Sequence, residues 1–149
     1  MHEKRLTQRL TEYWDRLRNE APLPQIERFN HGALEDVIGK CCLWRVEIRD
    51  PSAKTRLYTY EFVGAEMQQI IGSSDLIGTT LSPHFKDFPA ARIMGKIGNA
   101  VENAAIVVDE GQFVNTNNKV IKYRSCLLPF GTQDGRVTNV LLGISWKAF

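Results

Sequence analysis

Hydrophobic residues recur along the chain with two different periods, and each change of period marks a boundary between predicted elements. Over residues 3–19 the apolar side chains recur every three or four positions, which is the spacing of one helix face. This face consists of Leu6, Leu10, Tyr13, Trp14 and Leu17. The stretch 21–24 contains two prolines, which end the helix because proline lacks the amide hydrogen. The pattern therefore predicts an amphipathic helix and a proline linker over residues 1–24.

A period of two follows and predicts the first strands. Residues 41–50 and 56–63 form one strand each, separated by a turn at 50–54, and a short helix at 33–38 precedes them. In the second strand, alternation places Thr59 and Glu61 on one face. The opposite face carries the aromatic residues Tyr58, Tyr60 and Phe62.

The second half of the chain contains helices followed by strands. A short helical turn carrying Met67 ends at Gly72, and a longer helix is predicted over residues 89–105. A strand at 105–114 is expected to bend or break at Asp109-Glu-Gly111. A terminal hairpin then pairs residues 120–130 with 137–149 across a polar turn.

The order of these elements predicts the fold class. Sequential strands joined by short turns favour antiparallel pairing, and the long helical middle must cross one face of the sheet. We therefore expect an α+β fold with a five-stranded antiparallel sheet, helices on one face and a flanking N-terminal helix. Two alternatives remain open for that helix: it packs on the outer face of its own domain, or it pairs with a second copy.

Four short motifs, in their order and spacing, resemble a known family. They are Tyr13-Trp-Asp-Arg-Leu-Arg18 with Pro22-Leu-Pro24, Tyr58-Thr-Tyr-Glu-Phe-Val-Gly64, Gly72 with Asp75-Leu-Ile-Gly78, and Tyr123 to Pro129 with Gly143-Ile-Ser145. Together they resemble the PAS domain family, in particular its small stand-alone bacterial members of the alphaproteobacterial type. The resemblance implies a PAS domain over residues 25–149 that acts in sensing or protein interaction, generally without enzymatic activity. The family often has threonine where this chain has Ala65, and the stretch 41–44 is unusual for it.

Composition and charge exclude several function classes. The chain has 149 residues, which suits one domain, and its 19 basic and 17 acidic residues give a net charge of +2. So balanced a charge argues against a nucleic-acid partner. No apolar run approaches the roughly 20 residues that span a bilayer, and the N-terminus lacks the apolar core of a signal peptide. We expect a soluble, cytoplasmic protein without a membrane partner.

The cysteines and histidines do not indicate a cofactor. Cys41 and Cys42 are adjacent and point in opposite directions in a strand, so only one is expected to face the core. With Cys126 they are interpreted as buried hydrophobic residues, although a redox role for a thiol stays open. A haem sensor needs an axial histidine, commonly on the long helix, and that helix has none. A light-oxygen-voltage flavin sensor needs an Asn-Cys-Arg cysteine, which is absent, and too few ligands converge for a metal site.

An aromatic inner face is the predicted site. Apolar walls with a few hydroxyl groups are typical of a small-molecule pocket, and equally of a filled core. The candidate residues are Tyr58, Tyr60, Phe62, Met67, Met94, Ile97, Tyr123, Ser125 and Trp146.

The sequence therefore predicts a non-enzymatic sensory domain. A small apolar ligand would shift the sheet and the N-terminal helix, whose stripe from Leu6 to Leu17 would contact a second copy or a signalling partner. One alternative is a lyase or isomerase, which would need Glu61 or Glu66 to point into the pocket. The other is a structural adaptor whose pocket is filled by its own side chains.

Overall fold

The structure of the chain is a computed structural model that describes residues 2–50, 55–72, 75–85 and 87–149. Within these described residues there are three α-helices, three short 3₁₀ helices and five strands. The α-helices are α1 (His2–Arg18), α2 (Ala65–Ile71) and α3 (Ala90–Asn103). The strands are β1 (Cys41–Asp50), β2 (Thr55–Val63), β3 (Val107–Val114), β4 (Val120–Gly131) and β5 (Val137–Ala148). The 3₁₀ helices are Ile26–Arg28, His31–Leu34 and Ile38–Lys40, and the last two overlap the two ends of the short helix predicted at 33–38.

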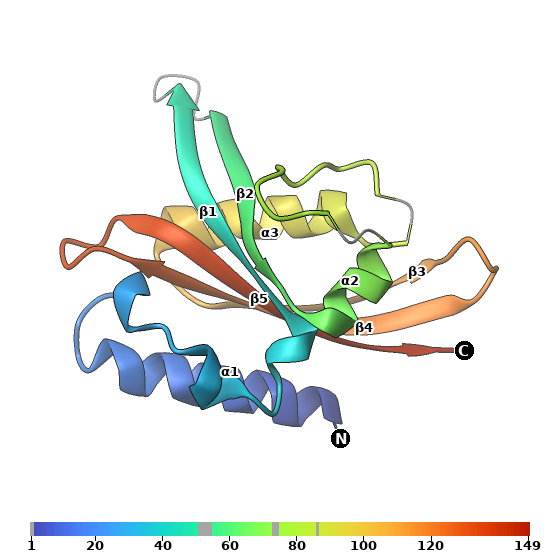
Figure 1. The fold of residues 1–149 in the computed structure, drawn as a ribbon, viewed down its shortest axis with the longest axis horizontal. Helices are drawn as coiled ribbons and strands as arrows, with labels where there is room; N and C mark the ends of the chain where they lie inside the picture. The colour runs from blue at the N-terminus through green and yellow to red at the C-terminus, as the bar shows by residue number, and fades with distance from the viewer. Residues whose placement is uncertain (1, 51–54, 73–74, 86) are drawn as a thin grey trace.

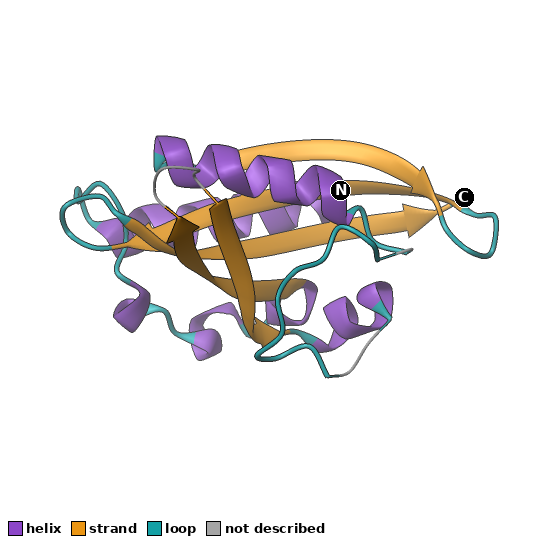
Figure 2. Cartoon of the chain, turned by 90° about the horizontal axis from the view of Figure 1, so that it is seen from above, coloured by secondary structure: helices purple, strands orange, loops and turns teal. Residues whose placement is uncertain are grey.

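The strands form one antiparallel sheet in the order β2-β1-β5-β4-β3. Both views show it strongly twisted, with the β1–β2 hairpin running steeply across the direction of the other three strands (Figure 1, Figure 2). Helices α2 and α3 lie on one face of the sheet and α1 lies on the other (Figure 1). The predicted fold class is confirmed. The predicted turn at 50–54 lies, apart from Asp50, outside the described residues.

The face under α3, which we call the inner face, carries the larger core. Its strands contribute alternate residues, and α3 contributes Ile93, Ile97 and Ala100, which follow the helical period. Met67 and Ile71 of α2 complete the cover.

The opposite, outer face is covered by α1. Leu6, Leu10, Tyr13 and Trp14 are buried against alternate residues of β1, β4 and β5, and Leu17 packs at the margin. The indole nitrogen Nε1 of Trp14 donates a buried hydrogen bond of 2.6 Å to the carbonyl oxygen of Pro129. The predicted stripe is therefore used within the same chain, which is the first of the two alternatives.

A β-bulge in β2 overturns one sequence prediction. Trp44 pairs with Tyr60, yet the neighbouring Leu43 pairs with Phe62, so Glu61 is an extra residue in β2. The extra residue reverses the alternation beyond it. Phe62 therefore lies with the outer-face cluster and not beside Tyr60, as a regular strand would require. Its ring contacts His31, with 4.5 Å between ring centroids.

Strand β3 is continuous from Val107 to Val114, so the predicted break at Asp109-Glu-Gly111 is wrong. Gly111 is accommodated in the strand because the Tyr123 ring lies directly over it. A Cβ atom at this position would be only 2.8 Å from the Tyr123 hydroxyl oxygen. The glycine leaves room for the Tyr123 ring of the neighbouring strand and does not end β3.

Candidate functional site

The inner face brings together eight of the nine predicted site residues. Tyr58, Tyr60, Tyr123 and Ser125 are buried on the sheet, and Met67 and Ile97 are buried on the helices above them. Met94 and Trp146 are partly buried at the margin of this group. Phe62 is the exception, since the bulge directs it to the outer face. The eight residues form part of a packed core.

Three donor atoms in this core have no hydrogen-bond partner among the described residues. They are Trp44 Nε1, Arg56 Nε and the Tyr60 hydroxyl oxygen. Trp44 and Tyr60 are paired across β1 and β2, with 5.6 Å between ring centroids. Arg56 lies farther along β2 and is held by Glu102 of α3 at 3.4 Å. Buried polar groups in folded proteins are almost always hydrogen-bonded, so three unpaired donors in one region are unusual.

Burial keeps the phenol groups of this region protonated. It raises the pKa of Tyr60, with a smaller contribution from Cys42 and an opposing one from the side chain of Trp44 beside it, and it raises the pKa of Tyr58 against an opposing contribution from Arg56. The guanidinium group of Arg56 is always charged and only donates. The region therefore offers donors and suits a ligand that carries acceptor oxygen or nitrogen atoms.

Sequence reasoning missed Trp44 and Arg56. Trp44 lies in the stretch 41–44, which is unusual for the family, but the pattern assigned it no role. The same period-two alternation that gave Tyr58 and Tyr60 also assigns Arg56 to their face. A long charged side chain is ordinarily expected to reach solvent, which is why this position was not a candidate.

A separate recess of about 280 Å³ opens beside α2 and the β3–β4 turn. It contains one predicted site residue, Trp146, together with Phe113 and the amides of Gln69 and Asn117. Its carboxylate, Asp87, already accepts hydrogen bonds of 2.8 and 2.9 Å from the amide and hydroxyl groups of Thr116. The recess combines aromatic walls with amide groups, so it can hold a small polar molecule but has no free reactive group.

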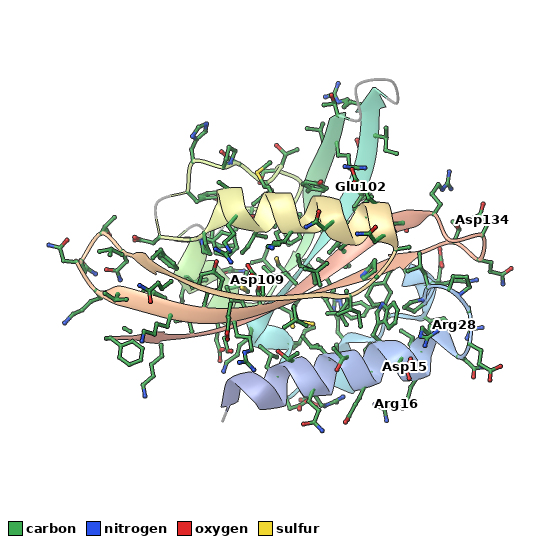
Figure 3. The ribbon with its side chains drawn as sticks, turned by 180° about the vertical axis from the view of Figure 1, so that it is seen from behind. Asp15, Arg16, Arg28, Glu102, Asp109 and Asp134 are labelled. Atoms are coloured by element: carbon green, nitrogen blue, oxygen red, sulfur yellow. The ribbon has the colours of Figure 1, made fainter. Side chains whose placement is uncertain are left out.

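An ion pair links α3 to the edge strand β3. Arg92 donates to both carboxylate oxygens of Asp109, at 2.7 and 2.9 Å. Figure 3 shows Asp109 on the strand below α3. The hydrogen bond from Arg92 holds the pKa of Asp109 below its usual value, against an opposing contribution from burial. The pair fixes α3 over the sheet.

The carboxylates that an enzyme would need do not point into the core. Glu61 is on the outer face, where it accepts a 2.6 Å hydrogen bond from Asn139 and a longer one from Arg45. Glu66 is exposed on α2. The residues proposed for the lyase or isomerase alternative are therefore placed elsewhere.

The cysteines are all buried, which corrects one expectation. Cys42 faces the inner core, and Cys41 faces the outer one, because both faces of the sheet are covered. Burial raises the pKa of Cys41 and of Cys126 to about 12, and raises that of Cys42. A reactive thiolate would require the opposite shift and an exposed sulfur atom.

Two further properties concern metals and membranes. Among the described residues, no three histidine, cysteine, aspartate or glutamate side chains lie close enough to hold a metal ion. Within the same residues, every helix is too short or too polar to cross a bilayer.

Comparison with solved structures finds a similar fold in light-oxygen-voltage domains. The dark structure of the blue-light photoreceptor Aureochrome1 LOV is similar, with 13% identity, a TM-score of 0.52, and coverage of 77% of this chain and 80% of that one. A light-oxygen-voltage domain studied with a flavin analogue has 11% identity, a TM-score of 0.51, and coverage of 78% and 82%. At sequence identities this low, the similarity concerns the fold alone.

Sequence comparison then identifies the family. No curated protein matches the chain. The family model described as PAS domain matches residues 2–145, which includes α1 as well as the sheet. The chain therefore belongs to the PAS domain family.

Proposed function

We propose that this PAS domain is a sensor for a small molecule bound between the inner face of the sheet and α3. The family is a sensory one and is generally non-enzymatic. The observation that carries the proposal is the group of three unpaired buried donors on Trp44, Tyr60 and Arg56. Each buried donor without a partner costs about 1–3 kcal/mol, so a molecule that supplies acceptors would gain affinity there.

The chemical class of the ligand follows from its surroundings. Tyr58, Met67 and Ile97 would contact an apolar body, while the donors would bind a carbonyl, carboxylate or ether oxygen. A flavin bound as in the light-oxygen-voltage domains would lack their photochemical thiol, since all cysteines of the sequence lie in β1 and β4. The ligand would have to displace side chains that now fill the core, so binding would move α3 or the sheet.

Such a movement would reach α1 through the sheet. In β5, Leu142 faces the inner core and its neighbour Leu141 faces the outer cluster under α1. Displacement of β5 by a ligand on one face would therefore alter the packing of α1 on the other. We further propose that the stripe Leu6–Leu17 then contacts a second copy or a signalling partner. The stand-alone bacterial origin and cytoplasmic location stay predictions.

The first experiment looks for the ligand directly. Native mass spectrometry and an absorption spectrum of the purified full chain should reveal an additional mass or an additional absorbance band. Trp44→Phe and Tyr60→Phe should each reduce the occupied fraction about tenfold, since each loses one hydrogen bond to the ligand. Phe149→Leu, an exposed aromatic residue outside both cores, is the control and should leave that fraction unchanged.

The second experiment needs no ligand. In the unoccupied protein Tyr60→Phe should leave the free energy of unfolding unchanged or higher, because its buried hydroxyl has no partner to lose and the ring volume is kept. Tyr13→Phe is the matched variant and should lower it by about 0.5–1.5 kcal/mol, since the Tyr13 hydroxyl accepts a 2.9 Å hydrogen bond from the amide of Asn30. A ligand-free protein in which Tyr60→Phe is as damaging as Tyr13→Phe would favour the structural adaptor instead.

A further inference from the structure

Strand β3 is one edge of the sheet, and half of its backbone groups face away from β4. In an antiparallel pair, residues that bond to the neighbouring strand alternate with residues that point away from it. The amide of Asn115 donates to the carbonyl oxygen of Lys119 across the β3–β4 turn at 2.9 Å. By alternation from Asn115, the odd-numbered residues of β3 bond to β4 and the even-numbered residues point away from it. The carbonyl oxygen of Glu110 accepts instead from Arg92 of α3, at 3.3 Å. The free edge is therefore made by Val108, Glu110, Gln112 and Val114.

The opposite edge of the sheet is protected. The amide of Tyr60 donates to Thr79, and the amides of Gly78 and Leu81 donate to Tyr60 and Tyr58, all at 2.8–2.9 Å. The loop at 78–81 thus occupies the edge of β2. Among the described residues, no backbone segment bonds to the four outward residues of β3. An open strand edge is a template for pairing with another strand.

The side chains along this edge form a symmetric pattern. Val108 and Val114 are 52% and 60% exposed, near the two ends of the strand. Glu110 and Gln112 lie between them on the same outer side, and Gly111 is the midpoint of all four. Exposed valines are unusual at a free edge, which is normally protected by charge.

We propose that two copies of this chain pair antiparallel through β3, with the two-fold axis at Gly111. In this register Val108 lies opposite Val114 of the second copy, and the symmetry repeats the contact. Glu110 lies opposite Gln112 of the second copy, so no like charges are paired. The four outward residues of each strand bond to the four of the other, with the Glu110 carbonyl oxygen accepting a second hydrogen bond beside the one from Arg92. The result is a continuous sheet of ten strands, within the usual size range.

The neighbouring registers are poorer. A shift that places the axis at Glu110 sets the two Glu110 carboxylates opposite each other, which is destabilising. A shift that places it at Gln112 sets Glu110 opposite Val114. Both separate the valines from one another.

Sedimentation velocity of the full chain over a concentration series tests the proposal. We expect a concentration-dependent dimer that Val108→Lys weakens at least tenfold, because two lysines then face valines. Gln112→Glu should weaken the dimer and Gln112→Lys should strengthen it, since this residue faces Glu110 of the second copy. Ile77→Lys, which is equally exposed in a distant loop, is the control and should have no effect. Circular dichroism verifies that each variant is folded.

Disulfide cross-linking tests the register. The Cα atoms of Val108 and Val114 of the second copy would be about 5.5 Å apart, within the range of a disulfide. A mixture of Val108→Cys and Val114→Cys chains should form a mixed disulfide dimer, whereas Val108→Cys alone should not. The native thiols are buried and should not interfere. A chain that stays monomeric, a dimer that Val108→Lys leaves intact, or equal cross-linking of Val108→Cys with itself would each overturn the proposal.

Discussion

At the scale of single residues, Gly143 determines how closely α1 lies on the sheet. Gly143 of β5 pairs with Cys41 on one side and Cys126 on the other, so the two thiols flank a position without a side chain. Leu10 of α1 fills this position, and a Cβ atom on Gly143 would collide with its Cδ1 atom. Because Leu10 is completely buried, it has no free space to move into.

Gly143→Ala should therefore lower the free energy of unfolding by about 1–3 kcal/mol, the usual cost of overpacking a core. Leu10→Ala should cost about 2–5 kcal/mol through the cavity it leaves. In the double variant the added methyl group enters that cavity. The double variant should therefore lose less unfolding free energy than the sum of the losses in the two single variants. Urea unfolding of the four proteins measures this coupling, and strict additivity would contradict the contact.

The buried thiols predict a loss of stability at high pH. The pKa of Cys126 is raised by burial from 9.0 to about 12 in the folded chain. Below pH 9 both states are protonated and the thiol contributes no pH dependence. Above it only the unfolded state ionises, so stability should fall progressively from pH 9 toward pH 12. Urea midpoints should fall less steeply for Cys126→Ala, and identical slopes would mean that the thiol ionises when folded.

At the scale of elements, sequence periodicity predicted the strands well but could not locate local irregularities. The predicted bounds of β1 and β4 agree with the structure to within one residue, because apolar runs and turn residues mark both strands. The bulge at Glu61 leaves no mark in that pattern, because Phe62 is apolar and fits either covered face. Gly111 was misread for a related reason: its role depends on Tyr123, a residue of the neighbouring strand. Such effects arise from pairing between distant segments.

The candidate site shows the same limit. Aromatic alternation was enough to identify Tyr58, Tyr60 and Tyr123 on the inner face. Whether a buried donor finds a partner depends on side-chain packing across β1, β2 and α3, which the sequence does not specify. Trp44 and Arg56 could therefore be identified only from the structure.

The ion pair between Arg92 and Asp109 makes the attachment of α3 sensitive to acid. Because the folded pKa of Asp109 lies below its usual value of about 3.9, the pair stabilises the fold above that pH and is lost as pH falls further. Asp109→Asn should remove this contribution and flatten the dependence of stability on pH below about 4. Thermal unfolding from pH 6 to pH 2.5 measures this pH dependence. Asp15→Asn, which removes the exposed ion pair of Asp15 with Arg18 on α1, is the control. Parallel curves for Asp109→Asn and the native chain would contradict the assignment.

At the scale of the whole molecule, the sheet separates two cores, and this explains the near-continuous apolar run of β4. Residues 126–130 are all buried, alternately under α3 and under α1. A strand covered on both faces is apolar throughout, whereas one exposed on a face alternates. The outer core exists only because α1 is present, so α1 is part of the folded unit in this arrangement. That bears on the predicted boundary between residues 1–24 and 25–149.

Removing residues 1–24 tests whether the remaining segment is a complete domain. The truncation would expose Leu43, Leu128, Phe130 and Leu141 on the outer face, a contiguous apolar surface that favours aggregation. We expect the 25–149 segment to bind the dye ANS, to sediment as aggregates and to unfold at a lower temperature than the full chain. Adding a peptide of residues 1–24 in trans should partly reverse each effect, while a peptide with Leu10→Ala should not. A monodisperse, fully stable 25–149 segment would show instead that α1 is a detachable element, free to leave the sheet when the domain signals.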